Sequence, residues 1–218
     1  MNIAEFSNVP CILALIIGFI LMMTLLYYPE WYIIDFLGII IGAGACAMIG
    51  ISIAVLPIVV FLIVLAIYDA ISVYKTKHMI DLADNVMTMK LPIILIIPKK
   101  LSYSFLEEKS LKKQLESKKE REAMFMGLGD VIIPGTLAVS ASSFLPKIAS
   151  IGGLSGNLLV ALGTVIGTVG GFIILMRYVM KGRPQAGLPL LNSGAIVGYM
   201  ISYYLVYSDL SFGFKFII

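Results

Sequence analysis

The stretch "CILALIIGFILMMTLLYY", residues Cys11 to Tyr28, contains no charged residue and would be apolar on every face of a helix. The hydrocarbon core of a bilayer is about 30 Å thick, and an α-helix needs about 20 mostly apolar residues to cross it. The rest of the chain has the same character: 60% of its 218 residues are hydrophobic, 13% are charged, and the mean hydropathy is +1.00. Soluble domains are only about 45–50% apolar. The sequence therefore predicts an integral membrane protein.

Apolar windows that are long enough to cross a bilayer recur along the chain and predict an all-α, polytopic fold with six transmembrane helices. Three windows precede a hydrophilic connection and three follow it, so the predicted regions are residues 1–75, 76–123 and 124–218. The windows are Cys11–Tyr28, Trp31–Ala54, Leu56–Tyr74, Met124–Leu145, Leu154–Met180 and Ala186–Tyr207.

The hydrophilic connection, from Lys75 to Ala123, carries eleven of the sixteen basic residues. Loops rich in Lys and Arg face the cytoplasm under the positive-inside rule. A smaller basic cluster, Arg177, Lys181 and Arg183, follows two crossings later and therefore falls on the same side. The sequence predicts a multi-pass protein of the cell membrane with this connection in the cytoplasm. Anionic lipid headgroups, rather than nucleic acid, are the expected counterpart of its lysines.

Two aspartates lie inside predicted spans: Asp69 in "LAIYDAISVY" and Asp130 in "MGLGDVIIPG". A charged side chain at the centre of a membrane helix costs about 2.5–3.5 kcal/mol on insertion scales, so its presence indicates a function. Asp69 lies six residues before Lys75, and Asp130 lies eight after Glu122. At about 1.5 Å per residue, both carboxylates lie roughly 9–12 Å below the basic boundary. They can face each other if their antiparallel helices pack side by side.

Two glycines beside Asp130 favour such packing, because Gly127 and Gly129 allow helix backbones to approach closely. Two close carboxylates share one proton and titrate as a coupled pair, as in the aspartic proteases. The ionised member can take a proton from water while the protonated member polarises a peptide carbonyl. The pair therefore predicts peptide hydrolysis that needs neither a metal nor a cofactor.

Other roles for membrane aspartates stay open: pairing with a basic residue, capping a broken helix, or holding a cation or proton in a coupled transporter. A salt bridge is disfavoured, because no Lys or Arg is predicted at the same depth. The paired inverted repeats typical of transporters are not evident in the sequence. A third acid, Asp35 after Trp31, is interpreted as an interfacial residue that caps its helix.

Three motifs together resemble the presenilin and signal peptide peptidase family of GxGD intramembrane aspartyl proteases. They are Tyr68-Asp69, Gly127-Leu128-Gly129-Asp130 and Ala186-Gly187-Leu188-Pro189, in this order on three predicted helices. The strings "YDAISVYKTKHMI" and "AGLPLLNSGA" look most like those of archaeal presenilin homologues. The prepilin peptidases share a GxGD motif but usually place Lys soon after it, whereas "DVIIPG" follows here. They also lack a proline-containing motif on a last helix.

The resemblance implies an endopeptidase that cleaves the transmembrane segments of membrane proteins or signal peptides, with Asp69 and Asp130 as its catalytic pair. It implies that the residues shaping the active site are Tyr68, Gly127, Leu128 and Gly129. It also implies a substrate-binding role, like that of the family's PAL motif, for Ala186, Gly187, Leu188 and Pro189. Ala186 and Gly187 stand where the family usually has Pro and Ala.

The family has nine transmembrane helices, and the six predicted here match its fourth to ninth. A three-helix N-terminal portion located elsewhere and a homo-oligomer both stay open. The expected partners are transmembrane peptides or proteins as substrates and the lipid bilayer.

Two further features have structural interpretations. "LPIILIIP", from Leu91 to Pro98, is too short to cross a bilayer, and either an edge strand that receives an unwound substrate or a membrane-surface anchor fits it. Gly163, Gly167 and Gly171 recur every four residues and predict a face for helix packing.

Overall fold

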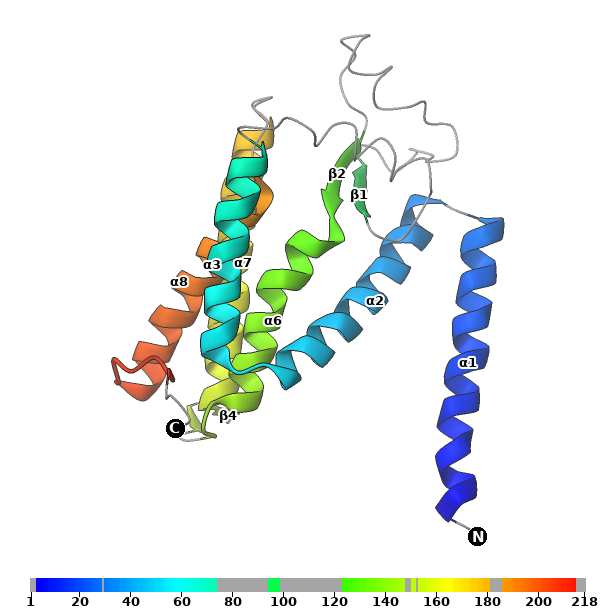
Figure 1. Ribbon diagram of the computed structural model, residues 1–218, viewed down its shortest axis with the longest axis horizontal. Coiled ribbons are helices and arrows are strands. Elements are labelled where there is room, and N and C mark those ends of the chain that lie inside the picture. The colour runs from blue at the N-terminus through cyan, green and yellow to red at the C-terminus, as the bar shows by residue number, and fades with distance from the viewer. Residues whose placement is uncertain are drawn as a thin grey trace. The chain divides into compact units, whose positions relative to one another are not determined.

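The computed structural model describes residues 3–28, 30–73, 94–98, 123–147, 150–151, 153–180 and 186–214. Most of these residues are helical (Figure 1), in α1 (Ile3–Tyr27), α2 (Trp31–Ser52), α3 (Val55–Ile71), α6 (Leu128–Phe144), α7 (Gly156–Met180) and α8 (Gly187–Tyr207). Two short sheets pair β1 (Ile94–Pro98) with β2 (Ala123–Gly127), and β3 (Ser150–Ile151) with β4 (Leu154–Ser155). The all-α prediction described the helices; a strand within Leu91–Pro98 was one of two interpretations left open, whereas β2, β3 and β4 were not predicted.

Each predicted window corresponds to one helix. Among the described residues, three helices are long and apolar enough to be candidate membrane spans: Val9–Tyr27, Trp31–Ser52 and Gly156–Val179. The prediction that Met124 belongs to a helix is wrong, because it lies in β2 and α6 begins only at Leu128. A short apolar run such as "AMFMG" suits a strand as well as a helix, so its period could not decide between them. Most of the predicted cytoplasmic connection, residues 74–93 and 99–122, lies outside the described residues.

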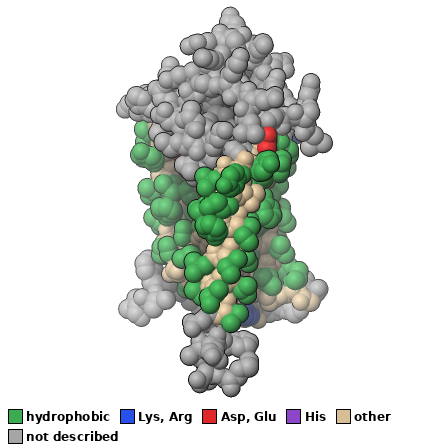
Figure 2. Space-filling model, turned by 90° about the vertical axis from the view of Figure 1, so that its right-hand side faces the viewer, with side chains coloured by type: hydrophobic (Ala, Val, Ile, Leu, Met, Phe, Trp, Pro, Cys, Tyr) green, Lys and Arg blue, Asp and Glu red, His purple; other side chains and the backbone are tan. Residues whose placement is uncertain are grey.

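Large hydrophobic side chains are exposed along the described helices. Figure 2 shows one face on which such side chains gather. Across the described helices as a whole, Leu15, Ile166 and Leu205 are each at least 70% exposed. Apolar surface on this scale is unfavourable in water and favourable against lipid tails. The exposed surface therefore supports the prediction of a membrane protein.

The chain divides into two compact units. One consists of Met1–Ile40 with Ala83–Met126, and the other of Ile41–Leu82 with Gly127–Ile218. In the first unit, the Asp35 carboxylate on α2 accepts a hydrogen bond of 2.8 Å from the backbone N–H of Ile96 in β1. Asp35 thus holds a strand, which the interpretation of this acid as a helix cap did not anticipate.

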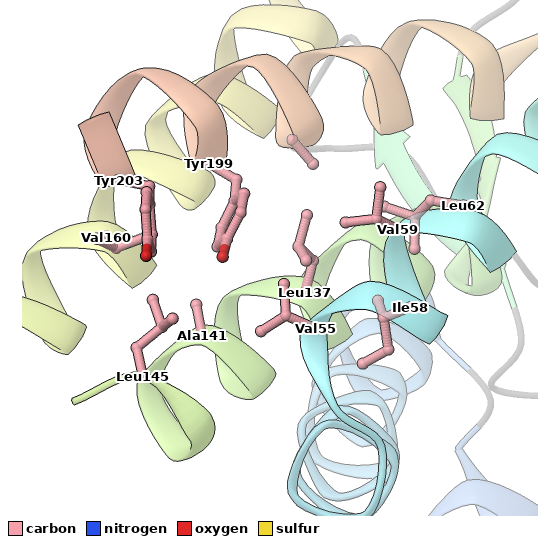
Figure 3. Close-up of a cluster of buried hydrophobic side chains, with 11 residues drawn as sticks. Val55, Ile58, Val59, Leu62, Leu137, Ala141, Leu145, Val160, Tyr199 and Tyr203 are labelled. Atoms are coloured by element: carbon pink, nitrogen blue, oxygen red, sulfur yellow. The ribbon is translucent and has the colours of Figure 1, made fainter. Parts of the chain in front are cut away.

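The second unit contains a buried core built by α3, α6, α7 and α8 (Figure 3). Leu62 from α3, Leu137 from α6, Val160 from α7 and Tyr199 from α8 are each fully buried in it. Side chains from all four helices therefore share one cluster, which fixes these helices against one another.

The junction between α2 and α3 is stabilised by α6. The Ser140 hydroxyl on α6 donates a hydrogen bond of 2.8 Å to the Ile53 carbonyl. Pro57, four residues after Ile53, has no backbone N–H to offer that carbonyl. An unpaired carbonyl is costly where water is excluded, so the serine hydroxyl supplies the missing donor and ties the start of α3 to α6.

Glycines allow α7 and α8 to pack with their backbones in contact. A Cβ atom placed on Gly167 would overlap the Gly194 carbonyl oxygen, and one placed on Gly194 would overlap the Gly167 carbonyl. A Cβ on Gly171 would likewise meet the Leu190 carbonyl oxygen. The predicted packing role of the α7 glycines is thereby confirmed, and the contact at Leu190 lies close to the beginning of α8.

Gly167→Ala should destabilise the protein, because the added methyl group can be accommodated only if two helix backbones separate. Overpacking of this kind costs about 1–3 kcal/mol. Gly170→Ala is the matched control on the same helix, since a Cβ there meets no atom within 4 Å. Thermal unfolding in detergent should give a lower midpoint for Gly167→Ala only. Equal midpoints for the two variants would contradict the packing described here.

Candidate active site

Asp69 lies in the last turn of α3, where its side chain is 8% exposed. Its carboxylate Oδ2 accepts a hydrogen bond of 3.2 Å from the backbone N–H of Leu188, in the first turn of α8. The first N–H groups of a helix have no partner within that helix. Ala186, at the N-cap of α8, provides no side-chain hydrogen bond, so Asp69 supplies the cap from another helix.

Asp130 lies in the first turn of α6. Its carboxyl group is packed between two glycines that come from different elements. A Cβ on Gly187 would lie 3.0 Å from Asp130 Oδ2, and one on Gly127 would lie 3.7 Å from the carboxyl atoms. The absence of side chains at these two glycines makes room for the carboxyl group.

The two carboxyl groups therefore lie against consecutive residues at the start of α8: Asp130 against Gly187, and Asp69 against Leu188. Because Gly187 and Leu188 are adjacent, the two carboxyl groups are near neighbours at this helix terminus. Like charges at short range disfavour simultaneous ionisation of both groups. The structure thus brings together two acids that lie 61 residues apart in the sequence and places them at one helix terminus.

The other predicted site residues differ in their surroundings. Ala186 is buried beside the aspartates at the N-cap of α8, and Leu128 is buried at the start of α6. Pro189, in the first turn of α8, accepts a hydrogen bond of 2.5 Å from the Ser193 hydroxyl. The Tyr68 side chain is 70% exposed, so the structure does not enclose it with the carboxylates.

Gly129 also lacks close neighbours, because a Cβ placed on it would meet no atom within 4 Å among the described residues. The described residues likewise contain no group of three or more His, Cys, Asp or Glu side chains that could hold a metal ion. Among the described residues, the start of α8 thus brings the two carboxylates against the backbone of its first turn.

One polar residue near this site was not singled out from the sequence. Asn192 on α8 is fully buried, and its side-chain Nδ2 donates a hydrogen bond of 2.9 Å to the Leu62 carbonyl on α3. The only available signal was an amide within an apolar window. Helical periodicity could not identify its partner, because Leu62 lies 130 residues earlier in the chain.

A pair of aspartates between apolar helices, of which Asp69 is buried and Asp130 half-buried, defines a class of membrane proteins with a two-carboxylate site. The family model described as signal-peptide peptidase, presenilin aspartyl protease matches residues 3–207. The chain belongs to this family.

Comparison with solved structures gives a match to one described as a presenilin family intramembrane aspartate protease. The two chains are 35% identical and superpose with a TM-score of 0.55. The match covers 86% of this chain and 60% of the length of the solved chain. A sequence comparison with curated proteins found no match.

Proposed function

We propose that this protein is an intramembrane aspartyl endopeptidase in which Asp69 and Asp130 together activate one water molecule. The observation that carries the proposal is the placement of the two carboxyl groups against Leu188 and Gly187. Family membership supports the same chemistry over a transporter, in which the aspartates would hold a cation or proton. The match to the presenilin family model also favours presenilin-like chemistry over that of the prepilin peptidases.

The proposed reaction needs one proton shared between the two carboxyl groups. The ionised aspartate takes a proton from water, and the resulting hydroxide attacks the peptide carbonyl carbon. The protonated aspartate donates a hydrogen bond to the carbonyl oxygen and stabilises the negative charge that develops there. Breakdown of the tetrahedral intermediate returns a proton to the leaving nitrogen. No covalent bond to the enzyme forms at any stage.

The backbone at the start of α8 contributes to this arrangement. The Leu188 N–H holds Asp69 by a hydrogen bond, and the N-terminus of a helix favours negative charge. Gly187 allows Asp130 to approach the same backbone. We propose that Ala186, Gly187, Leu188 and Pro189 also contact the substrate and that Tyr68, Gly127, Leu128 and Gly129 shape the site.

The proposed substrates are transmembrane segments of membrane proteins or signal peptides. A transmembrane helix hides its peptide bonds within its own hydrogen bonds, so it must unwind before water can attack. The β1–β2 sheet offers a place for an unwound segment to form strand hydrogen bonds. Along the chain, β2 is followed directly by α6, and Gly127, the last residue of β2, lies three positions before Asp130 in the sequence.

Leu95→Pro should impair cleavage of helical substrates. N–H groups alternate between the two edges of a strand, and the Ile96 N–H points to Asp35. The Leu95 N–H therefore faces the edge opposite to Asp35, and proline at this position removes a donor from a strand of the β1–β2 sheet. Removing that donor costs about 1–3 kcal/mol, which corresponds to roughly a 5- to 150-fold fall in kcat/KM.

This prediction is tested by comparing two substrates, an intact transmembrane segment and a short unstructured peptide with the same cleavage site. Leu95→Pro should slow cleavage of the first much more than that of the second. An unchanged rate for the helical substrate would exclude a role for the strand in receiving it.

The proposed topology is that of a multi-pass protein of the cell membrane. In it the six helices α1, α2, α3, α6, α7 and α8 each cross the bilayer, and the basic connection between α3 and α6 faces the cytoplasm. The basis is the distribution of Lys and Arg in the sequence. Single cysteines placed at Lys112 and at Ser208 should react with a membrane-impermeant thiol reagent from opposite sides.

The activity itself is tested by reconstituting the purified chain in liposomes with a labelled single-pass substrate. Mass spectrometry should find product termini inside the apolar segment of the substrate. Cleavage confined to the flanking polar residues, or none at all, would refute the proposed function.

A further inference from the structure

Asn192 has a buried side-chain amide that is only partly hydrogen-bonded, and the proposed chemistry does not explain its presence. Its side chain is fully buried among the membrane helices, yet only half of the amide has a partner. The Nδ2 group donates to the Leu62 carbonyl, whereas the Oδ1 atom is buried without a hydrogen-bond partner among the described residues. A buried polar atom without a partner costs free energy, and an apolar side chain of the same size would avoid that cost.

The position of this hydrogen bond suggests what the amide contributes. Asn192 lies four residues after Leu188 on α8, and Leu62 lies seven residues before Asp69 on α3. Two hydrogen bonds therefore join these antiparallel helices at two heights, one from Leu188 to Asp69 and one from Asn192 to Leu62. The apolar core contacts between α3 and α8 are non-directional, whereas two separated hydrogen bonds define the register in which the polar groups of the two helices meet.

We propose that Asn192 is a positioning residue, which sets the register of α8 against α3 so that the Leu188 N–H meets the Asp69 carboxylate. The effect of Asn192 on the helix register does not depend on the proposed function, whereas its effect on turnover rests on that function. A displacement of about 1 Å at a catalytic group can lower the rate by about 100-fold. The amide therefore contributes to turnover through Asp69 rather than through contact with the substrate.

Asn192→Leu tests this role, and Asn157→Leu provides a matched control. Asn157 is buried in the same manner: its Nδ2 donates to the Ser142 carbonyl, and its Oδ1 has no partner among the described residues. It lies near the start of α7, fourteen residues before Gly171, whose backbone meets α8 at Leu190. The control thus removes the same kind of amide about 21 Å along α7 from the contact between Gly171 and Leu190, at about 1.5 Å per residue.

We expect Asn192→Leu to remain folded and to lower kcat by about 10- to 100-fold, with KM changed by less than about threefold. Asn157→Leu should retain the kcat of the wild type. Asn192→Asp, which keeps the size of the side chain and removes the amide donor, should lower kcat as well and serves if the leucine variant does not fold. A wild-type kcat in folded Asn192→Leu or Asn192→Asp would overturn the proposal.

A second measurement does not depend on catalysis. Asp69→Cys and Leu188→Cys, in a chain whose Cys11 and Cys46 have been replaced by serine and alanine, should form a cross-link with a short thiol reagent. Adding Asn192→Leu should lower the yield severalfold, whereas adding Asn157→Leu should not. An unchanged yield with Asn192→Leu would overturn the proposed register even if the wild-type chain cleaved no substrate.

Discussion

Asp130→Asn is expected to lower kcat for a transmembrane substrate by about 10²- to 10⁴-fold, the range that a general acid or base contributes. Asparagine has nearly the shape of aspartate, so it fits the same space between Gly127 and Gly187. It can neither accept a proton from water nor share one with Asp69. The expected defect is therefore chemical, with thermal stability and KM close to those of the wild type.

Asp69→Asn should produce an equal loss of activity and separates two roles of that residue. Asp69 caps α8 through the Leu188 N–H, and the amide oxygen of asparagine can accept the same hydrogen bond. A residue that acted only as a cap would tolerate this change. Retention of more than about a tenth of wild-type kcat would indicate that capping is its whole contribution.

The double variant provides a further check. Residues that act as one unit give non-additive effects, so Asp69→Asn combined with Asp130→Asn should be no slower than either single variant. If the two aspartates contributed independently, the fold losses of the two single variants would multiply in the double variant. The rates of the wild type, the two single variants and the double variant, measured by mass spectrometry of the same substrate, decide between these cases.

Gly187→Val is expected to cause the second largest loss, of about 100-fold in kcat. A Cβ at this position lies 3.0 Å from Asp130 Oδ2, which is tighter than an ordinary contact. The methyl group of alanine requires the carboxyl group to move by only a few tenths of an ångström. Gly187→Ala should therefore stay within about threefold of the wild type. Valine adds two further methyl groups, and a shift of a few tenths of an ångström by the Asp130 carboxyl group would not make room for them.

Gly170→Val serves as the control for this series, because a Cβ at Gly170 meets no atom within 4 Å. Its activity should match that of the wild type. Equal activities for Gly187→Val and Gly170→Val would show that Asp130 does not need its position against α8.

The sequence predicted much of the helical fold because membrane helices have a strong signal. The windows Trp31–Ala54 and Leu154–Met180 differ from α2 and α7 by only two residues at one end. The strand at residues 123–127 was missed, since five apolar residues do not show a period. For Leu91–Pro98 the sequence left a strand and an anchor open, and the structure shows that Ile94–Pro98 forms a strand.

The matching depth predicted for the two acids assumed helical rise on both sides of the connection. For Asp130 that assumption is wrong, because residues 123–127 form β2 and only Leu128 and Gly129 precede it in α6. The neighbours of these and other buried polar groups could not be derived from the sequence at all. The hydrogen bond of Asp35 to Ile96 and that of Asn192 to Leu62 depend on which helix faces lie together. Which helix faces meet is decided by tertiary packing. The sequence of one apolar window does not predict which other helix it will contact.

The central claim, that Asp69 and Asp130 meet at one site, is tested most directly by cross-linking. Cysteines replace both aspartates in a chain whose Cys11 and Cys46 have been removed, and a short bifunctional thiol reagent is added in liposomes. The predicted result is an intramolecular cross-link between positions 69 and 130, but none between positions 69 and 143. Ser143 lies about 20 Å further along α6 at about 1.5 Å per residue. Failure to link positions 69 and 130, with both thiols shown to be reactive, would contradict the account.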